Sequence, residues 1–296
     1  MNKSIIRVLA VLLAVFMTLT FAACSGGGGG AEKPGTDAGN NNQAGQQQPA
    51  APESEDGPIM AKVKQTGKIV LGTSADYAPY EFHKMIDGVD HIVGFDIEIA
   101  KEIAKGLGVE LEIKEIAFDG LLAALQLGKV DFVIAGMTPN EERKKEVDFT
   151  KIYYMAQQGV LIRAEDADII KSVEDLTGKK VGAQRGSIQE DIAREQLSVA
   201  EVKALAKVPD LVLELEHGKV DAIVVELPVA NEYIKRNSKL VLSEIHVEDD
   251  TGGSAIAVAK GNEDLVEKMN EIIDALIAEG KIDKFVAEAI EMVDNE

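Results

Sequence analysis

Hydrophobic residues recur along this chain at the spacings typical of strands and of helices. Residues 68–73 and 131–136 are short, nearly continuous apolar runs, which predict buried strands. Residues 109–116 alternate apolar and charged side chains, as a half-exposed strand does. From Asp96 to Gly108 apolar residues return every three or four positions, which predicts a helix with Asp96 as its N-cap. Alternating strands and helices predict an α/β fold.

This order of elements occurs twice. The sequence Gly-Lys-Val-Asp stands at 128–131 and again at 218–221, each time before an apolar run, and Thr-Gly-Lys stands at 66–68 and 177–179. A short Leu-rich helix is expected before each glycine, beginning at an N-cap Asp119 in the first copy. Two similar α/β halves are therefore expected, with a ligand in the cleft between them.

Two helix starts have the layout of a capping box. Thr138 has Glu141 three residues later, with Pro139 between them, and Ser187 has Glu190 at the same spacing. Each follows a buried strand, which places both helix N-termini at the carboxyl edge of a sheet. There their free N–H groups favour a carboxylate or phosphate. Two helix caps without any ligand are the alternative.

Charged residues near these edges are candidates for ligand contacts. The guanidinium fork of Arg143 can bind a carboxylate through two parallel hydrogen bonds. Because Arg143 belongs to the charge run 141–146, a solvent-facing side chain is the alternative. Glu226 ends a buried strand of the second copy and can meet an ammonium group; an exposed loop acid is the alternative.

Aromatic residues gather after the first strand, although the chain is poor in aromatics and has no Trp. Tyr77, Tyr80 and Phe82 lie within one short segment, and Phe118 follows another predicted strand. Core packing is the alternative for Tyr80 and Phe82.

The N-terminus has the pattern of a bacterial lipoprotein signal. Lys3 and Arg7 precede an apolar run that ends at Phe21, and small residues lead from there to Cys24, the only cysteine. Residues 1–23 are expected to be a signal peptide, and Cys24 to carry lipid, palmitate included. A generic secretory signal is the alternative. The stretch 24–58, rich in Gly, Gln and Asn, is expected to be a flexible tether.

Charge and composition exclude several functions. The net charge of −20 argues against a nucleic-acid partner and against adsorption to anionic lipid. The four histidines are scattered, and no Ser/His/Asp set, zinc spacing or phosphate loop occurs. No catalytic residue, metal or cofactor is therefore expected.

Several segments in order carry a family resemblance, from about residue 67 to residue 285. They include Gly-Thr-Ser-Ala-Asp-Tyr-Ala-Pro at 72–79, Gly-Phe-Asp at 94–96, the stretch 135–150 with its Glu-Arg-Lys-Lys, and Gly-Ala-Gln-Arg-Gly-Ser at 182–187. Together they resemble the amino-acid-binding proteins of bacterial ABC importers, the polar-amino-acid group of extracellular solute-binding proteins, family 3.

The resemblance implies a two-lobed periplasmic-binding-protein-like fold of type II, in which each lobe is a mixed sheet flanked by helices. It implies lobe 1 at 59–157 plus 251–296 and lobe 2 at 158–250. Two hinge strands, near 157–162 and 254–259, are expected to join the lobes.

The resemblance also implies the ligand site. Arg143 would clamp the α-carboxylate of an amino acid, assisted by backbone N–H groups of Gly136, Thr138 and Ser187. Glu226 would receive the α-ammonium, where the family usually has Asp. Tyr77 and Phe118 would hold the ligand side chain. From the charges of the residues themselves, Asp76 or Glu81 is expected to reach the far end of a cationic side chain. The further candidate contacts are Ser74, Ala135, Gln184, Ile188 and Gln189.

The expected function is capture of a free polar amino acid, with cationic Arg, Lys or His preferred. A lipid-anchored monomer on the outer face of the membrane, in a Gram-positive cell, would deliver the ligand to the permease of an ABC importer. A glutamine-specific binding protein is one alternative. The others are an enzyme resembling cyclohexadienyl dehydratase, a signalling receptor domain and a surface adhesin.

Overall fold

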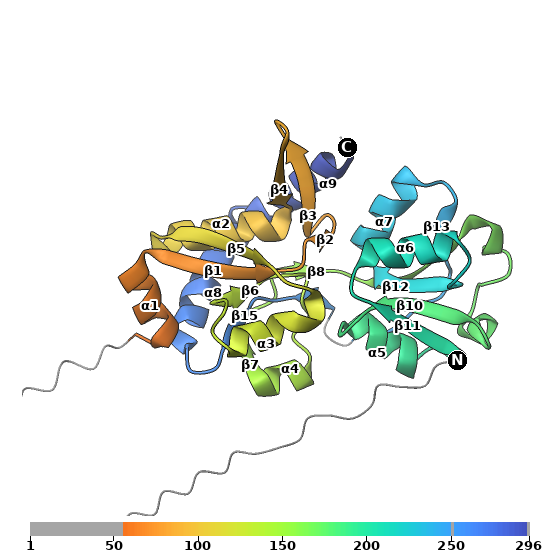
Figure 1. Cartoon of the computed structure of the whole chain (residues 1–296), viewed down its shortest axis with the longest axis horizontal. Coiled ribbons are helices and arrows are strands. Elements are labelled where there is room, and N and C mark those ends of the chain that lie inside the picture. Colours follow the sequence, from red (N-terminus) through yellow and green to blue (C-terminus); the bar gives the residue numbers. More distant parts are fainter. Residues whose placement is uncertain (1–55, 250–251, 295–296) are drawn as a thin grey trace, which may run out of the picture. The chain divides into compact units, whose positions relative to one another are not determined.

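The computed structural model describes residues 56–249 and 252–294, which belong to one compact unit, Pro52–Glu296. Cys24, the predicted signal peptide and nearly all of the predicted tether lie outside these residues. Two five-stranded sheets organise the described chain (Figure 1). We call lobe 1 the sheet β5-β1-β6-β15-β7 with its helices, and lobe 2 the sheet β11-β10-β12-β9-β13 with its helices.

The elements have the following bounds. The strands of the lobe 1 sheet are β1 (Lys68–Thr73), β5 (Glu110–Glu115), β6 (Phe132–Val133), β7 (Val147–Phe149) and β15 (Ala257–Ala259). Those of the lobe 2 sheet are β9 (Gln158–Arg163), β10 (Lys180–Gln184), β11 (Glu201–Leu205), β12 (Ala222–Glu226) and β13 (Leu240–Leu242). The lobe 1 helices are α1 (Pro58–Thr66), α2 (Phe95–Leu107), α3 (Leu121–Gln126), α4 (Glu141–Glu146), α8 (Glu263–Ala278) and α9 (Lys281–Asp294). The lobe 2 helices are α5 (Ile188–Glu195), α6 (Val208–Glu216) and α7 (Leu227–Arg236).

The predicted duplication is confirmed by the pairing of the strands. β1 pairs in parallel with β5 and β6, and β10 pairs in parallel with β11 and β12. Two antiparallel strands complete each sheet. The two Gly-Lys-Val-Asp motifs play the same part, because Asp131 accepts the Val70 N–H and Asp221 accepts the Lys180 N–H, both at 2.9 Å. Each aspartate thus ties its strand to the start of the neighbouring strand.

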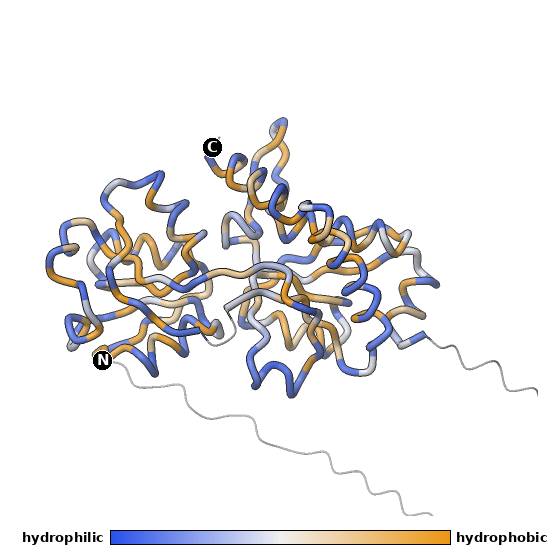
Figure 2. Tube along the Cα trace, turned by 180° about the vertical axis from the view of Figure 1, so that it is seen from behind, coloured by the Kyte–Doolittle hydropathy of each residue, from blue (hydrophilic) through white to orange (hydrophobic). Residues whose placement is uncertain are grey.

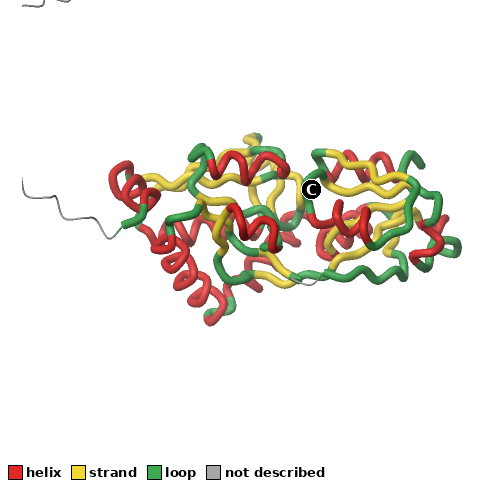
Figure 3. The backbone as a smooth tube through the Cα atoms, turned by 90° about the horizontal axis from the view of Figure 1, so that it is seen from below, coloured by secondary structure: helices red, strands yellow, loops and turns green. Residues whose placement is uncertain are grey.

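Helices cover both faces of each sheet, as the alternation of side chains requires. On β1, Ile69 and Leu71 pack with residues of α2 and α8, whereas Val70 faces the cluster that contains α3. In lobe 2, α5 covers one face, and α6 and α7 cover the other. Figure 3 shows the helices beside the strands in this arrangement. In Figure 2, hydrophobic colour recurs along the strands and within the helices, and hydrophilic colour marks many connecting turns.

Several predicted helix starts are wrong in detail. Helix α2 begins at Phe95 with Gly94 as N-cap, because the Asp96 carboxylate turns inward instead of capping its own helix. Asn140, and not Thr138, caps α4 by accepting the Arg143 N–H at 2.9 Å. Asp119 lies in the 3-10 turn Phe118–Gly120 and makes no cap hydrogen bond. Ser187 caps α5 as predicted.

Two predicted strands also change. The predicted strand 131–136 shortens to β6, and Gly136, with a positive φ of 53°, lies outside the sheet. The predicted hinge strand near 157–162 is β9, in the interior of the lobe 2 sheet. The strands β8 (Tyr154–Met155) and β14 (Gly253–Ser254) pair with each other in a separate two-stranded sheet. They lie on the segments of chain that run between the two larger sheets. The lobe boundaries and the hinge motion stay predictions.

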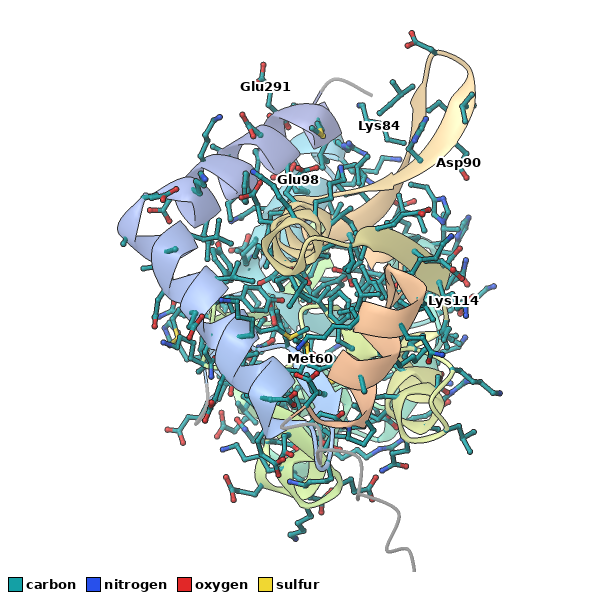
Figure 4. The ribbon with its side chains drawn as sticks, turned by 90° about the vertical axis from the view of Figure 1, so that its left-hand side faces the viewer. Met60, Lys84, Asp90, Glu98, Lys114 and Glu291 are labelled. Carbon is teal, nitrogen blue, oxygen red and sulfur yellow. The ribbon has the colours of Figure 1, made fainter. Side chains whose placement is uncertain are left out.

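A third, three-stranded sheet extends from lobe 1. It consists of β2 (Asp76–Tyr77), β3 (Glu81–Ile86) and β4 (Val89–Val93). Figure 4 shows the β3–β4 hairpin projecting beside α9, with Lys84 on the side toward that helix and Asp90 on the other strand. The Lys84 ammonium donates to the Met292 carbonyl at 2.5 Å, which ties the hairpin to the end of α9. The base of this sheet carries Asp76, Tyr77 and Glu81.

Candidate functional site

The most deeply placed cation of the site is Arg143, in the first turn of α4. Its side chain is 9% exposed, and Nη1 donates to the Thr138 carbonyl at 2.7 Å. Nη2 crosses to lobe 2 and donates to the Gly186 carbonyl at 2.9 Å. Its Cζ lies 5.4 Å from the centre of the Phe118 ring. Sequence analysis left open whether Arg143 faces solvent, and the structure shows that it points inward.

Arg143 has no ionic partner in the described part of the chain. Burial lowers its pKa to about 10, and the nearest charge that favours its cationic form is Asp191. Neither carbonyl partner carries a charge, so the guanidinium is only partly neutralised by its surroundings. A buried cation of this kind is stabilised by an incoming carboxylate.

The matching acidic residue is Glu226, at the end of β12 in lobe 2. It is 2% exposed and accepts a short hydrogen bond from the Tyr80 hydroxyl of lobe 1. Its backbone N–H donates to the Tyr77 hydroxyl at 3.2 Å. Burial raises the pKa of Glu226 to about 8, with a further contribution from Asp96. Within residues 56–249 and 252–294, no lysine, arginine or histidine nitrogen lies within ion-pair distance of this carboxyl.

Asp76 connects the two lobes from the base of the three-stranded sheet. Its carboxylate accepts from the Ser74 hydroxyl at 2.9 Å, from the Gln184 amide at 3.2 and 3.3 Å, and from the Val208 N–H at 2.8 Å. Val208 is the first residue of α6, whose N-cap Lys207 makes no side-chain cap. Asp76 therefore supplies the cap of a lobe 2 helix from lobe 1. Burial raises its pKa.

The predicted amide and aromatic contacts gather around Tyr77. The Gln189 side chain donates to the Tyr77 hydroxyl at 3.4 Å and to the Gln158 carbonyl oxygen at 2.9 Å. Tyr77 and Tyr80 have ring centres 5.3 Å apart. Aromatic and amide groups from both lobes therefore converge beside Glu226.

Two predicted backbone donors are already engaged. The Gly136 N–H donates to Asp96 Oδ2 at 2.8 Å, and the Ser187 N–H donates to the Gln184 carbonyl at 3.2 Å. Thr138 contributes its carbonyl to Arg143. Ala135 packs in the core cluster that contains Phe118. The assisting role of the Gly136 and Ser187 amides toward a ligand stays a prediction, and both amides have partners within the protein.

A cleft of about 550 Å³ lies where α4 and α5 face each other. Ile188 is part of its wall, together with Pro139 and Asn140 from lobe 1 and Asp191 and Ile192 from lobe 2. Both helix N-termini thus border one hollow, although its lining includes neither Arg143 nor Glu226. Ile188 is also part of the apolar core of lobe 2.

Glu81 does not lie where it would reach a ligand side chain. It is 1% exposed, it lies beside the Asp96 carboxyl, and neither of its carboxyl oxygens has a hydrogen-bond partner among the described residues. Two buried carboxyl groups placed together disfavour ionisation of both, because burial penalises each charge and like charges repel. Asp96 is the ionised member, since it lies in the first turn of α2 and accepts the Gly136 N–H and the Tyr153 hydroxyl. Glu81 therefore carries the proton, and burial raises its pKa well above the usual range.

The stability of the protein is expected to fall as the pH rises above about 4.5, in part because of this pair. A carboxyl whose pKa is higher in the folded than in the unfolded chain contributes stability that is complete below the unfolded value and is lost as the pH rises through the folded value. The pKa of Asp96 is raised to about 6 by burial, and that of Glu81 is raised further. Urea unfolding of the protein and of Glu81→Gln from pH 5 to pH 9 measures the effect. The amide of the variant can still donate to Asp96 but cannot ionise. Its free energy of unfolding is therefore expected to decline less with rising pH than that of the wild type. Equal declines in the two proteins contradict the assignment of the proton to Glu81.

Sequence reasoning missed Tyr80, Gln158 and Asp96 as parts of the site. Core packing was the alternative given for Tyr80; its side chain is fully buried, and its hydroxyl reaches Glu226. The sequence signal that could have identified Tyr80 is its hydroxyl group, on an aromatic residue three positions after Tyr77. No local pattern indicated Gln158.

Comparison with known proteins agrees with the fold. Residues 69–291 match the model of bacterial extracellular solute-binding proteins, family 3. The arginine-binding extracellular protein ArtP of Bacillus subtilis is 39% identical over 222 residues, covering 73% of this chain and 84% of that protein. The glutamine-binding protein GlnH of the same species is 34% identical, covering 76% of this chain and 82% of that protein.

A solved structure is similar over nearly the same part of the chain. The amino acid ABC transporter substrate-binding protein AbpA of Streptococcus pneumoniae, bound to L-arginine, has a TM-score of 0.77 and 38% identity. The match covers 79% of this chain and 98% of AbpA. These relatives are binding proteins of transporters, which confirms the predicted type II fold and the prediction that the chain is not an enzyme.

Two further findings concern the described residues alone. None of their helices is both long and apolar enough to cross a membrane. No group of three or more His, Cys, Asp and Glu side chains among them is placed to hold a metal ion.

The match over residues 69–291 and the relatives above establish that this chain belongs to the bacterial extracellular solute-binding proteins of family 3.

Proposed function

We propose that this protein captures a free L-amino acid between its two lobes and delivers it to the permease of an ABC importer. The observation that carries the proposal is a pair of buried, opposite and ionically unpaired groups. Arg143 comes from lobe 1 and Glu226 comes from lobe 2. An amino acid carries the complementary pair, a carboxylate and an ammonium, on one carbon atom.

The division of the two groups between the lobes couples binding to closure. Burying an ion without a partner is costly, and pairing it with an opposite charge offsets that cost. Neither lobe alone supplies both partners, so a zwitterion favours the arrangement in which the lobes meet. Hinge closure of this kind, around the β8–β14 pair, would give the permease a ligand-dependent surface to recognise.

We infer a preference for a cationic side chain. Asp76 offers a buried carboxylate at the junction of the lobes, and Tyr77 and Phe118 offer ring faces that attract a cation. The arginine-binding relatives support this inference. Gln184 and Gln189 suit an amide, and the glutamine-binding relative keeps glutamine as the second candidate.

The mode of attachment belongs to the same proposal. Cleavage before Cys24 and lipidation of its thiol would hold a monomer on the outer face of the membrane, with residues 24–58 as tether. More than one acyl chain gives stable anchoring, whereas a single chain does not. Mass spectrometry of the protein purified from cells tests this directly, and an unmodified Cys24 contradicts it.

A thermal-shift screen against the twenty amino acids tests the proposed function. A ligand that binds only the native state raises the unfolding midpoint, by an amount that grows with its concentration. We expect the largest increase with L-arginine, L-lysine or L-histidine. A screen in which no amino acid raises the midpoint, in a protein that circular dichroism shows to be folded, contradicts the proposal.

Asp76→Asn is expected to reduce the difference in affinity between cationic amino acids and L-glutamine. The variant keeps the size and an acceptor oxygen of the side chain but removes its charge. We expect L-arginine affinity to fall by roughly tenfold, as for one charge-assisted hydrogen bond, with a smaller change for L-glutamine. Titration calorimetry with both ligands measures it, and Asp90→Asn on the exposed hairpin is the matched control. Equal losses for the two ligands would assign Asp76 to lobe closure alone.

A further inference from the structure

The Glu226 carboxyl is surrounded by groups that do not neutralise a negative charge. Tyr77 and Tyr80 approach it from lobe 1, and the neutral Gln158 amide lies near it on β9, where its nitrogen donates to Asp249. The charged groups that act on it most strongly are acidic, Asp96 on α2 and Asp249 before β14. Glu81 on β3 adds a further buried carboxyl, whose pKa is raised well above the usual range by burial and by Asp96. Tyr153 and Tyr154, at the start of β8, add two neutral phenol groups on which the Glu226 charge acts. Each of these groups is neutral or acidic.

A carboxylate in such surroundings is costly, and neutralisation by a proton is the common outcome. We propose that the closed, empty site holds Glu226 as a neutral acid, and that an incoming amino acid displaces this proton when its ammonium takes the proton's place. This inference rests on the proposed function, and it adds a proton to the binding reaction. The O–H bond of Glu226 breaks, the proton leaves to solvent, and the ligand ammonium keeps all of its own protons.

The exchange predicts how affinity depends on pH. Burial raises the pKa of Glu226 to about 8 in the empty site, and an adjacent ammonium lowers it again. Between these two values the bound form holds fewer protons than the empty form, so affinity is expected to rise with pH. The increase is at most about tenfold per pH unit, and it levels off near pH 8.

Tyr80 is assigned as the positioning residue of this exchange. Its ring is fully buried, lies 4.4 Å from the Phe95 ring centre to centre, and directs its hydroxyl to Glu226 across the lobe junction. By donating to the carboxyl, Tyr80 favours the ionised form and opposes the effect of burial. Removing the hydroxyl is therefore expected to shift the midpoint of the affinity profile to higher pH.

Titration calorimetry of the purified full-length protein in two buffers of different ionisation enthalpy counts the protons. The probes are L-arginine and L-glutamine, in phosphate and in Tris, at pH 6, 7 and 8. At pH 7 we expect nearly one proton released per ligand bound, and at pH 8 about half of one, as a group titrating near pH 8 requires. Binding without proton release at all three values overturns the inference and leaves the proposed function intact. Absence of binding by every amino acid overturns both.

Three variants separate the exchange from a structural effect. Glu226→Gln is expected to bind weakly and to release no proton. Tyr80→Phe is expected to shift the midpoint of the affinity profile to higher pH. Tyr233→Phe removes a hydroxyl from a partly buried tyrosine of α7 whose pKa is raised by burial and by Asp76, and it serves as the matched control. Proton release that persists in Glu226→Gln, or a Tyr80→Phe profile identical to that of the control, contradicts the assignment.

Discussion

Arg143→Met is expected to lower the affinity for the amino acid ligand by about thirtyfold or more, because it removes the charge-assisted fork. Loss of charge-assisted hydrogen bonds costs about 2 kcal/mol or more, which corresponds to that factor. Arg143 is buried and unpaired in the described chain, so its charge is available to a ligand carboxylate. Titration calorimetry with L-arginine measures the change.

Two companion variants sharpen this experiment. Arg143→Lys keeps the charge but loses the planar fork and is expected to retain part of the affinity. Lys144→Met removes a cation from the next position of α4, where the side chain is 46% exposed and paired with Glu141. It is expected to leave affinity unchanged. Wild-type affinity in a folded Arg143→Met protein would show that the carboxylate is bound elsewhere.

Gly94→Ala is expected to destabilise the fold by about 3 kcal/mol or more, since it combines a clash with a backbone conformation that only glycine adopts readily. A Cβ at this position would lie 2.1 Å from the Tyr80 carbonyl oxygen, and φ is 129°. The Asp96 N–H donates to the same carbonyl at 3.0 Å. The substitution therefore also disturbs the segment that carries Tyr80 toward Glu226.

Gly88→Ala, at the tip of the hairpin, separates the effect of the backbone conformation from the effect of the clash. Gly88 has a positive φ of 80° but open space around the new Cβ, so about 1 kcal/mol is expected there. Urea unfolding of both variants measures the difference. Similar losses at the two glycines would mean that the Tyr80 backbone yields to the added methyl group.

The site was predictable where family motifs and local chemistry coincide. Arg143 and Glu226 were identified with their charges, and the structure buries both. The Ser187 cap was correct because its geometry depends only on the residues that follow it. The caps assigned to Asp96 and Thr138 were wrong for different reasons, since a distant amide competes for Asp96 and a neighbouring side chain replaces Thr138. The Gly136 amide takes Asp96, and Asn140 takes over the start of α4.

The sequence by itself determined the α/β class, the duplicated halves and the identity of the charged groups, since these follow from periodicity, repeated motifs and residue type. Only the tertiary structure decided what those groups touch. Tyr80 meets Glu226 although 146 positions separate them, and Asp76 caps α6 from a distance of 132 positions. Such contacts leave no local pattern, because hydrogen bonding and desolvation depend on which side chains the folded lobes bring together.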